Sequence, residues 1–240
     1  MTGPRYIADT TTALTASASP GSPNTPLSLV QTDDFEQWRA GHNDAQRAWI
    51  DSSGFQAKSG QTLRFPTALS SPEDSGERLV AGWDGQSNLA TLGGLPMTLP
   101  EGVYRATAQH SDLELLGWAM GSYQFNHYRE PKRAPAQLLI DDAQQCHRVL
   151  QEARAVALAR DLINYPAGDM LPSHLAAAAT ELAAAFEADC EVIVGEDLLK
   201  KGYRTIHAVG RAATDAPRLI DLRWGCLLYT SDAADDYFWV

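Results

Sequence analysis

Cysteine is scarce in this chain. Three cysteines, Cys146, Cys190 and Cys226, are spread over 240 residues, with no CxxC pair and no histidine at metal-ligand spacing beside them. An odd, widely spaced set of this kind indicates neither a disulfide framework nor a zinc site. Since disulfide frameworks are typical of exported proteins, their lack favours a reducing compartment, and we expect a cytoplasmic protein.

Long apolar runs are also missing. No segment approaches the roughly 20 apolar residues that a membrane-spanning helix needs, so no membrane partner is expected. Residues 1–26 are rich in Thr, Ser, Ala and Pro and lack the apolar centre of a signal peptide. Such a segment buries too little apolar surface to offset its ordering entropy, so residues 1–26 are predicted to be a disordered leader.

Basic residues are outnumbered by acidic ones. The 19 Lys and Arg residues face 30 Asp and Glu residues, for a net charge of −11. A surface of this sign repels phosphate backbones, so nucleic acid is not expected as a partner. The cluster Arg129, Lys132 and Arg133 surrounds a proline and is interpreted as a solvated loop, with a local basic patch as the alternative.

The first half of the chain shows strand-like pieces and two clear helices. Strands are expected at residues 26–31, 61–66, 77–83, 102–108 and 136–140. One helix is expected from Phe35 to Gly54, capped by Thr32 or Asp33, with Trp38 and Trp49 in the core instead of a ligand box.

The second clear helix begins with a capping signal. Ser111 is the expected N-cap, and Glu114 completes a capping box. Gly117 and Gly121 lie on one side of this helix and permit close approach of a neighbouring backbone.

Two further features of the first half resemble ligand sites. The Gly93-Gly94 pair lacks the strand–loop–helix context of a phosphate loop, so a turn is predicted there. His127 lies in an aromatic run and is interpreted as structural or exposed.

A long helix follows, opened by Asp141 or Asp142 and unbroken until Pro166. About 22 residues at a rise of 1.5 Å give a length of about 33 Å, enough to cross from one domain to the next. Beyond Pro166 a helix led by Pro172 and strands near residues 190–195 and 217–224 alternate. This alternation predicts an α/β arrangement with a parallel sheet.

One stretch carries a family resemblance. Residues 159–175 read ARDLINYPAGDMLPSHL, and CEVIVGEDLL, TIHAVGRAA and APRLIDLRWG follow in that order. Together they resemble the cytosol (leucyl) aminopeptidase family of metallopeptidases, specifically over residues 153–225 and more loosely over residues 27–140. A long helix ending in Arg-Asp-Leu-x-Asn-x-Pro is part of that pattern, and it matches Arg160, Asp161, Leu162, Asn164 and Pro166.

The residues of this motif have a physical interpretation of their own. Asn164 tolerates the left-handed conformation at the end of a helix, and Pro166 prevents the helix from continuing. They therefore indicate a hinge where a second domain starts.

The resemblance implies a fold and an activity. It implies a small N-terminal α/β, macrodomain-like accessory domain at residues 27–140, a linker helix at 141–163, and the incomplete start of an α/β catalytic domain at 164–225. It also implies a hydrolase that removes N-terminal residues from peptides, with two divalent metal ions, zinc or manganese. A homohexamer is implied for the full-length parent.

The residues that would perform this chemistry are expected beyond the strand at 217–224. The family carries them in a Gly-Lys-Gly strand end and an Asn-Thr-Asp-Ala-Glu-Gly-Arg loop, and neither motif occurs in the sequence. The acidic clusters at residues 140–147 and 232–236 are interpreted as helix-capping or solvated. We therefore predict no catalytic, cofactor-binding or metal-binding residue in this chain, and no peptidase activity.

The last residues have an unusual explanation. CLLYTSDAAD can be encoded by TGT CTC TTA TAC ACA TCT GAC GCT GCC GAC, the transposon-end adapter of sequencing libraries. Residues 226–240 are therefore predicted to be an adapter-derived tail, the alternative being a divergent native C-terminus. Two other functions stay open: a non-catalytic binding or oligomerisation module, and an inactive fragment that aggregates through an unpaired strand at 217–224.

Overall fold

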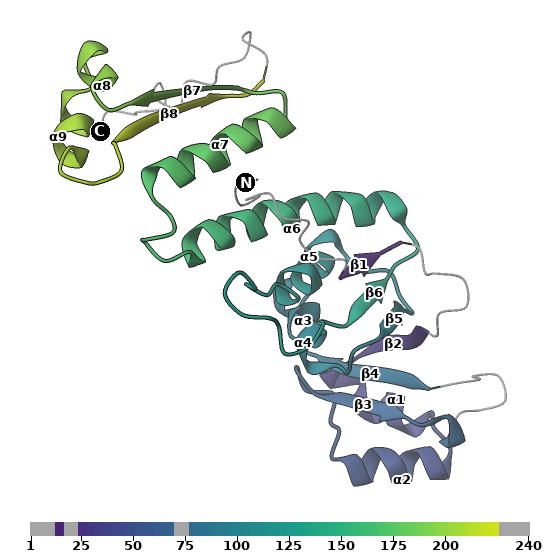
Figure 1. The fold of residues 1–240 in the computed structure, drawn as a ribbon. Helices are drawn as coiled ribbons and strands as arrows, with labels where there is room; N and C mark the ends of the chain where they lie inside the picture. The colour runs from purple at the N-terminus through teal and green to yellow at the C-terminus, as the bar shows by residue number, and fades with distance from the viewer. Residues whose placement is uncertain (1–12, 17–23, 70–76, 226–240) are drawn as a thin grey trace, which may run out of the picture. The chain divides into compact units, whose positions relative to one another are not determined.

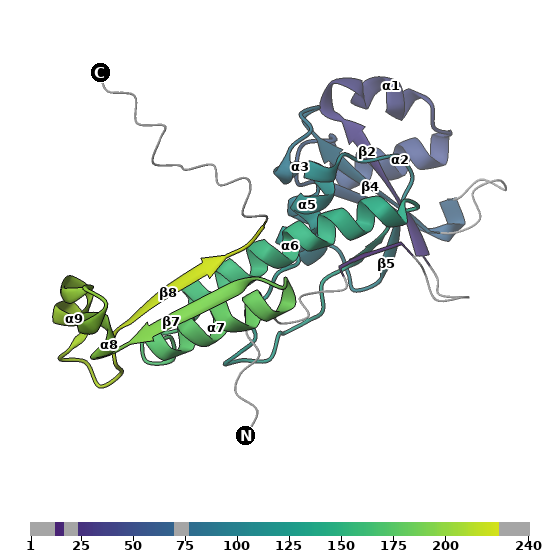
Figure 2. The same ribbon diagram turned by 90° about the horizontal axis from the view of Figure 1, so that it is seen from above.

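The computed structural model describes residues 13–16, 24–69 and 77–225. The chain divides into two compact units, and the division falls between Ala157 and Leu158, inside one continuous helix. Each unit combines helices with a sheet, as Figures 1 and 2 show. The predicted α/β class is therefore confirmed for both parts of the chain.

The N-terminal unit is built on a six-stranded sheet with the order β1-β6-β5-β2-β4-β3. Neighbouring strands are parallel, except that β3 runs antiparallel to β4. The strands are β1 (Leu14–Thr15), β2 (Asn24–Gln31), β3 (Thr62–Phe65), β4 (Arg78–Trp83), β5 (Val103–Ala106) and β6 (Gln137–Leu139). The five strands that the sequence predicted in this half are all present.

Two apolar clusters fill the two faces of this sheet. The larger one joins strand residues such as Leu27 and Leu138 to Leu115, Trp118 and Val149 from the helices. Its helices are α3 (Leu89–Gly93), α4 (Leu95–Thr98), α5 (Asp112–Gly121) and the first half of α6 (Ala143–Asn164). The smaller cluster lies beneath α1 (Phe35–Ala40) and α2 (Asp44–Ser53). Two short 3-10 helices are also present: η1 (Thr32–Asp34) directly before α1, and η2 (Thr67–Leu69) after β3.

The predicted glycine contact on α5 is confirmed. A Cβ atom added at Gly117 would overlap the carbonyl group of Leu89, and one added at Gly121 would overlap that of Gly93. Both carbonyl groups belong to α3, so α3 and α5 touch backbone to backbone. The two glycines are spaced one helical turn apart because α3 crosses that single side of α5.

The leader was predicted wrongly where it is described. Leu14–Thr15 forms an edge strand parallel to β6, and Ala13 and Leu14 are 1% and 2% exposed. Backbone N–H groups of Leu138 and Ile140 donate to the carbonyls of Ala13 and Thr15 at 2.8 and 3.0 Å. The composition of residues 1–26 could not predict this strand, because only two residues form it. The strand nevertheless completes one edge of the sheet. Residues 1–12 and 17–23 lie outside the described part of the chain.

The single helix predicted from Phe35 to Gly54 is two helices. The chain breaks at Gly41 because Asn43 caps α2: its side chain accepts from the backbone N–H of Gln46 at 2.9 Å, and the Gln46 side chain accepts in return. The end at Gly54 is confirmed, with Gly54 in the left-handed region at φ 68°. Thr32 caps no helix, and its hydroxyl instead donates to the Ala57 carbonyl at 2.8 Å.

Two smaller expectations also need correction. Trp38 packs against the smaller apolar cluster as predicted, but Trp49 is 40% exposed and donates through Nε1 to the carbonyl of Arg64. A turn is present at Gly94 as predicted, but it joins two short helices, because Gly93 is the last residue of α3 and Leu95 is the first of α4.

The C-terminal unit contains the end of α6 and five further elements. These are α7 (Pro172–Ala185), β7 (Asp189–Val194), α8 (Asp197–Lys200), α9 (Arg204–Gly210) and β8 (Arg218–Arg223). The structure begins α7 at Pro172 and ends α6 at Asn164, as the sequence predicted. In Figure 1, α7 runs along the β7–β8 pair.

The parallel sheet predicted for this unit is wrong for the described residues. β7 and β8 are antiparallel, with Val194 opposite Arg218 and Asp189 opposite Arg223. The two short helices α8 and α9 return the chain to the end at which β7 finished, where the Gly195 N–H donates to the Pro217 carbonyl at 2.9 Å. A parallel pair needs a connection that crosses the sheet, and α8 and α9 are too short to do so. Alternating strands and helices can therefore also give an antiparallel pair.

Candidate functional site

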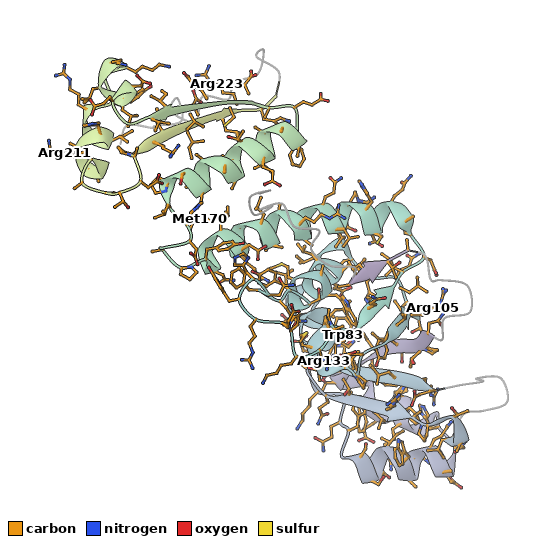
Figure 3. All side chains as sticks on the ribbon, in the orientation of Figure 1. Trp83, Arg105, Arg133, Met170, Arg211 and Arg223 are labelled. Atoms are coloured by element: carbon orange, nitrogen blue, oxygen red, sulfur yellow. The ribbon has the colours of Figure 1, made fainter. Side chains whose placement is uncertain are left out.

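The acidic cluster at the start of α6 is held by protein groups. Asp142 accepts from the backbone N–H groups of Gln144 and Gln145 at 2.8 and 3.0 Å, so its predicted capping role is confirmed. Asp141 forms an exposed ion pair at 2.7 Å with Arg105 of β5, which is labelled in Figure 3. Neither carboxylate is arranged as one of a pair of metal-bridging ligands.

A metal centre of the implied kind does not fit the described residues. Nowhere in residues 13–16, 24–69 and 77–225 do three His, Cys, Asp or Glu side chains come together as a metal-binding group. The second acidic cluster, at residues 232–236, lies outside the described part of the chain. The two thiols in the described part are free: Cys146 is buried, which raises the pKa of its thiol, and Cys190 is half-buried.

The basic cluster separates into two kinds of side chain. Arg129 and Lys132 are exposed, which confirms the interpretation as a solvated loop. Arg133 (labelled in Figure 3) instead donates to the carbonyl oxygens of Pro96 and Leu99 at the end of α4. His127 is exposed and its ring packs edge-on against Tyr128, with centroids 4.7 Å apart.

The N-terminal unit has a pocket that the sequence did not predict. It lies at the carboxyl ends of β5 and β6, where ligands commonly bind in open α/β sheets, and has a volume of about 540 Å³. It is lined by Ala106, Thr107, Ala108, Gln109, His110, Leu115, Ile140, Asp141, Asp142, Gln145 and Arg148.

A buried hydrogen-bonded pair lies at the wall of this pocket. His110 Nδ1 and Glu114 Oε2 are 3.2 Å apart, and their side chains are 6% and 8% exposed. Burial raises the pKa of Glu114, but hydrogen bonds from Ser87, the Ser111 N–H and His110 outweigh it, so that pKa is lowered overall. Glu114 therefore stays a carboxylate. The predicted Ser111–Glu114 capping box is confirmed; the i, i+4 spacing of His110 and Glu114 was the signal for the pair itself.

The other polar groups of the pocket bond to one another. The side-chain amide of Gln145 donates to Asp112 at 2.8 Å and to the carbonyl of His110 at 2.9 Å. Arg148 lies 3.4 Å from the same Asp112 carboxylate. These contacts fasten the start of α5 to α6, which explains the arrangement without a ligand.

The beginning of α7 is capped from a distant loop. Leu171, the residue before Pro172, has no side-chain acceptor, so the backbone N–H of Ser173 donates instead to Asp215 Oδ2 at 2.6 Å. Asp215 also pairs with Arg218 at the start of β8, at 3.1 Å. The pKa of Asp215 is lowered, chiefly by the hydrogen bond from the Ser173 backbone. One carboxylate thus holds α7 to the loop before β8.

Removing this carboxylate is expected to destabilise the C-terminal unit. Asp215→Ala leaves the Ser173 N–H without its acceptor and lowers the thermal midpoint, whereas Asp215→Asn keeps an acceptor and lowers the midpoint less. Because the folded pKa lies below the ordinary value of about 3.9, this contribution is complete above that value and is lost as the pH falls below it. Midpoints by circular dichroism across this range should therefore converge for wild type and Asp215→Asn in acid, because protonated Asp215 keeps a neutral acceptor as Asn does. A gap that persists there would contradict the assignment.

The described residues form a two-domain α/β protein. A first α/β unit is followed by a shorter second unit, and α6 is shared between them. Known proteins match both parts. The model of the M17 aminopeptidase N-terminal domain matches residues 25–141, and that of the cytosol aminopeptidase catalytic domain matches residues 157–232. The chain belongs to the M17 cytosol aminopeptidase family.

Individual relatives agree with this. A probable cytosol aminopeptidase of Roseiflexus castenholzii is 34% identical over 122 residues, which are 45% of this chain and 25% of the relative. One from Mycobacterium bovis is 32% identical over 144 residues, 56% of this chain and 26% of the relative. The matched part of the chain thus spans about a quarter of these relatives' length.

Solved structures give the same correspondence. The cytosol aminopeptidase of Coxiella burnetii has a TM-score of 0.78 at 30% identity, over 90% of this chain and 47% of that one. The bottromycin maturation enzyme BotP, in complex with Mn, has a TM-score of 0.63 at 25% identity, over 83% of this chain and 44% of that one. Among the described residues of our chain, no helix is long and apolar enough to span a membrane.

Proposed function

We propose that the chain is the N-terminal part of a metal-dependent aminopeptidase that removes N-terminal residues from peptides. The observation that carries this is the order of the two matched domains, N-terminal at residues 25–141 and catalytic from residue 157. The chain spans less than half of the Coxiella burnetii structure, which supports the assignment to a longer parent.

Residues 1–240 alone are proposed to have no peptidase activity. The Gly-Lys-Gly and Asn-Thr-Asp-Ala-Glu-Gly-Arg motifs that the family resemblance requires for metal binding and catalysis are not in the sequence. Two bridging metals need several carboxylate ligands at close spacing, and Asp141 and Asp142 are bonded to Arg105 and to the α6 backbone. We name no residue of this chain as catalytic.

The test is hydrolysis of leucyl p-nitroanilide by purified residues 1–240 with added manganese. Release of p-nitroaniline is expected to equal that of a metal-free control. The full-length Coxiella burnetii cytosol aminopeptidase, in the same buffer, provides the positive control. Manganese-dependent turnover by residues 1–240 would refute the proposed inactivity.

We keep the domain limits predicted from the sequence as proposals, except where the structure places a limit elsewhere. The accessory domain was placed at residues 27–140 and the linker helix at 141–163, but the compact units divide at Ala157. Residues 226–240 are proposed to be adapter-derived. The catalytic-domain match ends at residue 232, inside this segment, so the boundary at Cys226 rests on the codon pattern. The nucleotide sequence beneath Cys226 decides it.

The remaining properties concern the parent protein. We propose two divalent ions, zinc or manganese, a homohexameric assembly and a cytoplasmic location, without nucleic acid or membrane partners. Support comes from the manganese complex of BotP, from the name cytosol aminopeptidase shared by the relatives, and from the net charge of −11.

A binding role for the N-terminal unit has one observation in its favour. The pocket beside β5 and β6 has the volume of a small-molecule site. Its polar groups are paired with one another, His110 with Glu114 and Gln145 with Asp112. The aminopeptidase assignment, which two family matches support, is therefore preferred.

A further inference from the structure

The pocket at the carboxyl ends of β5 and β6 has polar atoms that its internal hydrogen bonds do not use. All of its lining residues belong to the N-terminal unit, and its volume of about 540 Å³ is within the range of small-molecule sites. The hydrogen bonds that fasten α5 to α6 occupy only some atoms of these residues. The chemistry of the remaining atoms decides which ligand the pocket can bind.

Hydrogen-bond donors come from the loop after β5 and from α6. In the described part of the chain, the backbone N–H groups of residues 108–110 have no protein acceptor. These residues lead into Ser111, the N-cap of α5, where the helix dipole adds positive potential. On α6, Arg148 donates to Asp112 through Nε alone, so its terminal nitrogens stay available. This set of donors suits a carboxylate.

His110 contributes a buried ring nitrogen to the same pocket. Its side chain is 6% exposed and lines the pocket, and its Nδ1 lies 3.2 Å from Glu114 Oε2. Since Glu114 is a carboxylate, it accepts from Nδ1–H, and this hydrogen bond fixes the tautomer of the ring. Nε2 of the neutral ring is then an acceptor, and no donor to it is present among the described residues.

Further acceptors come from the start of α6. Asp141 accepts from Arg105 through Oδ1, and Asp142 caps α6 through its own Oδ1. The second oxygen of each carboxylate, Oδ2, has no donor in the described part of the chain. Two carboxylate oxygens and Nε2 of His110 match the three N–H donors of an ammonium group.

A ligand with a single charge would use only half of these groups. An anion would be repelled by the carboxylates of Asp141 and Asp142, and a cation would meet Arg148 and unpaired N–H groups. A zwitterion satisfies donors and acceptors together. The pocket also provides apolar contacts for a side chain, from Ala106, Leu115 and Ile140.

We propose that this pocket binds a free amino acid with an apolar side chain. The α-carboxylate of the ligand accepts from the N–H groups of residues 108–110 and from Arg148. Its α-ammonium donates to Asp141, Asp142 and Nε2 of His110. Removal of N-terminal residues from peptides releases molecules of this class, so the pocket takes a product of the parent protein, a link that rests on the proposed function.

The test is a titration of isotopically labelled residues 1–240 with L-leucine to about 10 mM, followed through amide chemical shifts by NMR. Saturable shifts are expected at residues 108–110. L-Leucinamide lacks the carboxylate and N-acetyl-L-leucine lacks the ammonium. Each is expected to bind at least about tenfold more weakly, because each loses charge-assisted hydrogen bonds. Glycine, without an apolar side chain, is also expected to bind more weakly than leucine.

Two variants test the protein side of the contact. Asp141→Asn and Arg148→Gln change exposed side chains and are each expected to weaken leucine binding about fivefold or more. Asp51→Asn and Arg39→Gln provide the matched controls, since these residues form an exposed ion pair between α2 and α1, and they should leave the affinity unchanged.

Three results would overturn the proposal. They are the lack of saturable shifts with leucine, equal affinity for leucine and leucinamide, and equal weakening by the pocket variants and their controls. The last would indicate a general effect of charge in place of a site. Binding is measured without turnover, so its failure would leave the aminopeptidase assignment as it stands, and failure of that assignment would leave the binding result intact.

Discussion

Gly121→Ala is expected to destabilise the N-terminal unit strongly, whereas Gly94→Ala, at the residue next to Gly93, is expected to change little. The added Cβ at Gly121 would overlap backbone atoms of Gly93, which cannot move aside as a flexible side chain can. A Cβ at Gly94 meets nothing within 4 Å, and Gly94 has an ordinary φ of −83°.

The magnitudes are far apart. Overpacking against fixed backbone costs about 3 kcal/mol or more, against a total stability of about 5–15 kcal/mol for a domain. At Gly94 the change should stay within about 0.5 kcal/mol. Urea unfolding of both variants, followed by far-ultraviolet circular dichroism, measures the difference. Equal midpoints for the two variants would mean that α3 and α5 are not in backbone contact.

The second large effect is expected at Trp118. This side chain is fully buried at 0% exposure, and its Nε1 donates to the Ala13 carbonyl at 3.0 Å. Trp118→Ala is expected to cost about 3–5 kcal/mol through the cavity it leaves. Trp118→Phe keeps most of the apolar contact and removes one of the two donors to the Ala13 carbonyl, which still accepts from the Leu138 N–H, so the cost is about 0.5–1.5 kcal/mol.

The Trp118→Phe variant has a local readout. The N–H groups of Leu138 and Ile140 bond to β1, so their hydrogen exchange should accelerate more than exchange elsewhere in the sheet. Trp49→Phe is the matched control, because Trp49 also donates to a backbone carbonyl but is 40% exposed. If both variants lose the same stability, Trp118 does not anchor β1.

The sequence was informative where a local rule has a single outcome. The capping box of Ser111 and Glu114 and the start of α7 at Pro172 are where they were expected. α6 also ends at Asn164 as expected, but Asn164 does not adopt the left-handed conformation, since the non-glycine residues with positive φ in the described part of the chain are Ala57 and Glu187. The spacing of Gly117 and Gly121 likewise predicted a close contact, though not its partner α3, which depends on the tertiary fold.

Features that depend on distant partners could not be predicted. Leu14–Thr15 is a strand because it pairs with the edge of β6, and the sequence of these two residues alone does not predict this pairing. β7 and β8 are antiparallel because the α8–α9 connection doubles back, which strand patterns alone do not indicate. Asp215 caps α7 across a separation of 42 residues, so no local pattern reveals it.

The position of the division between the units has a consequence for exchanging domains among relatives. It falls between Ala157 and Leu158, within the continuous α6 helix, where each backbone N–H bonds to a carbonyl one turn earlier. A junction placed at that division would join two half-helices from different parents. A hybrid should therefore inherit α6 whole, from Ala143 to Asn164, so that helix phase and the buried face of Val149 and Ala153 come from one source.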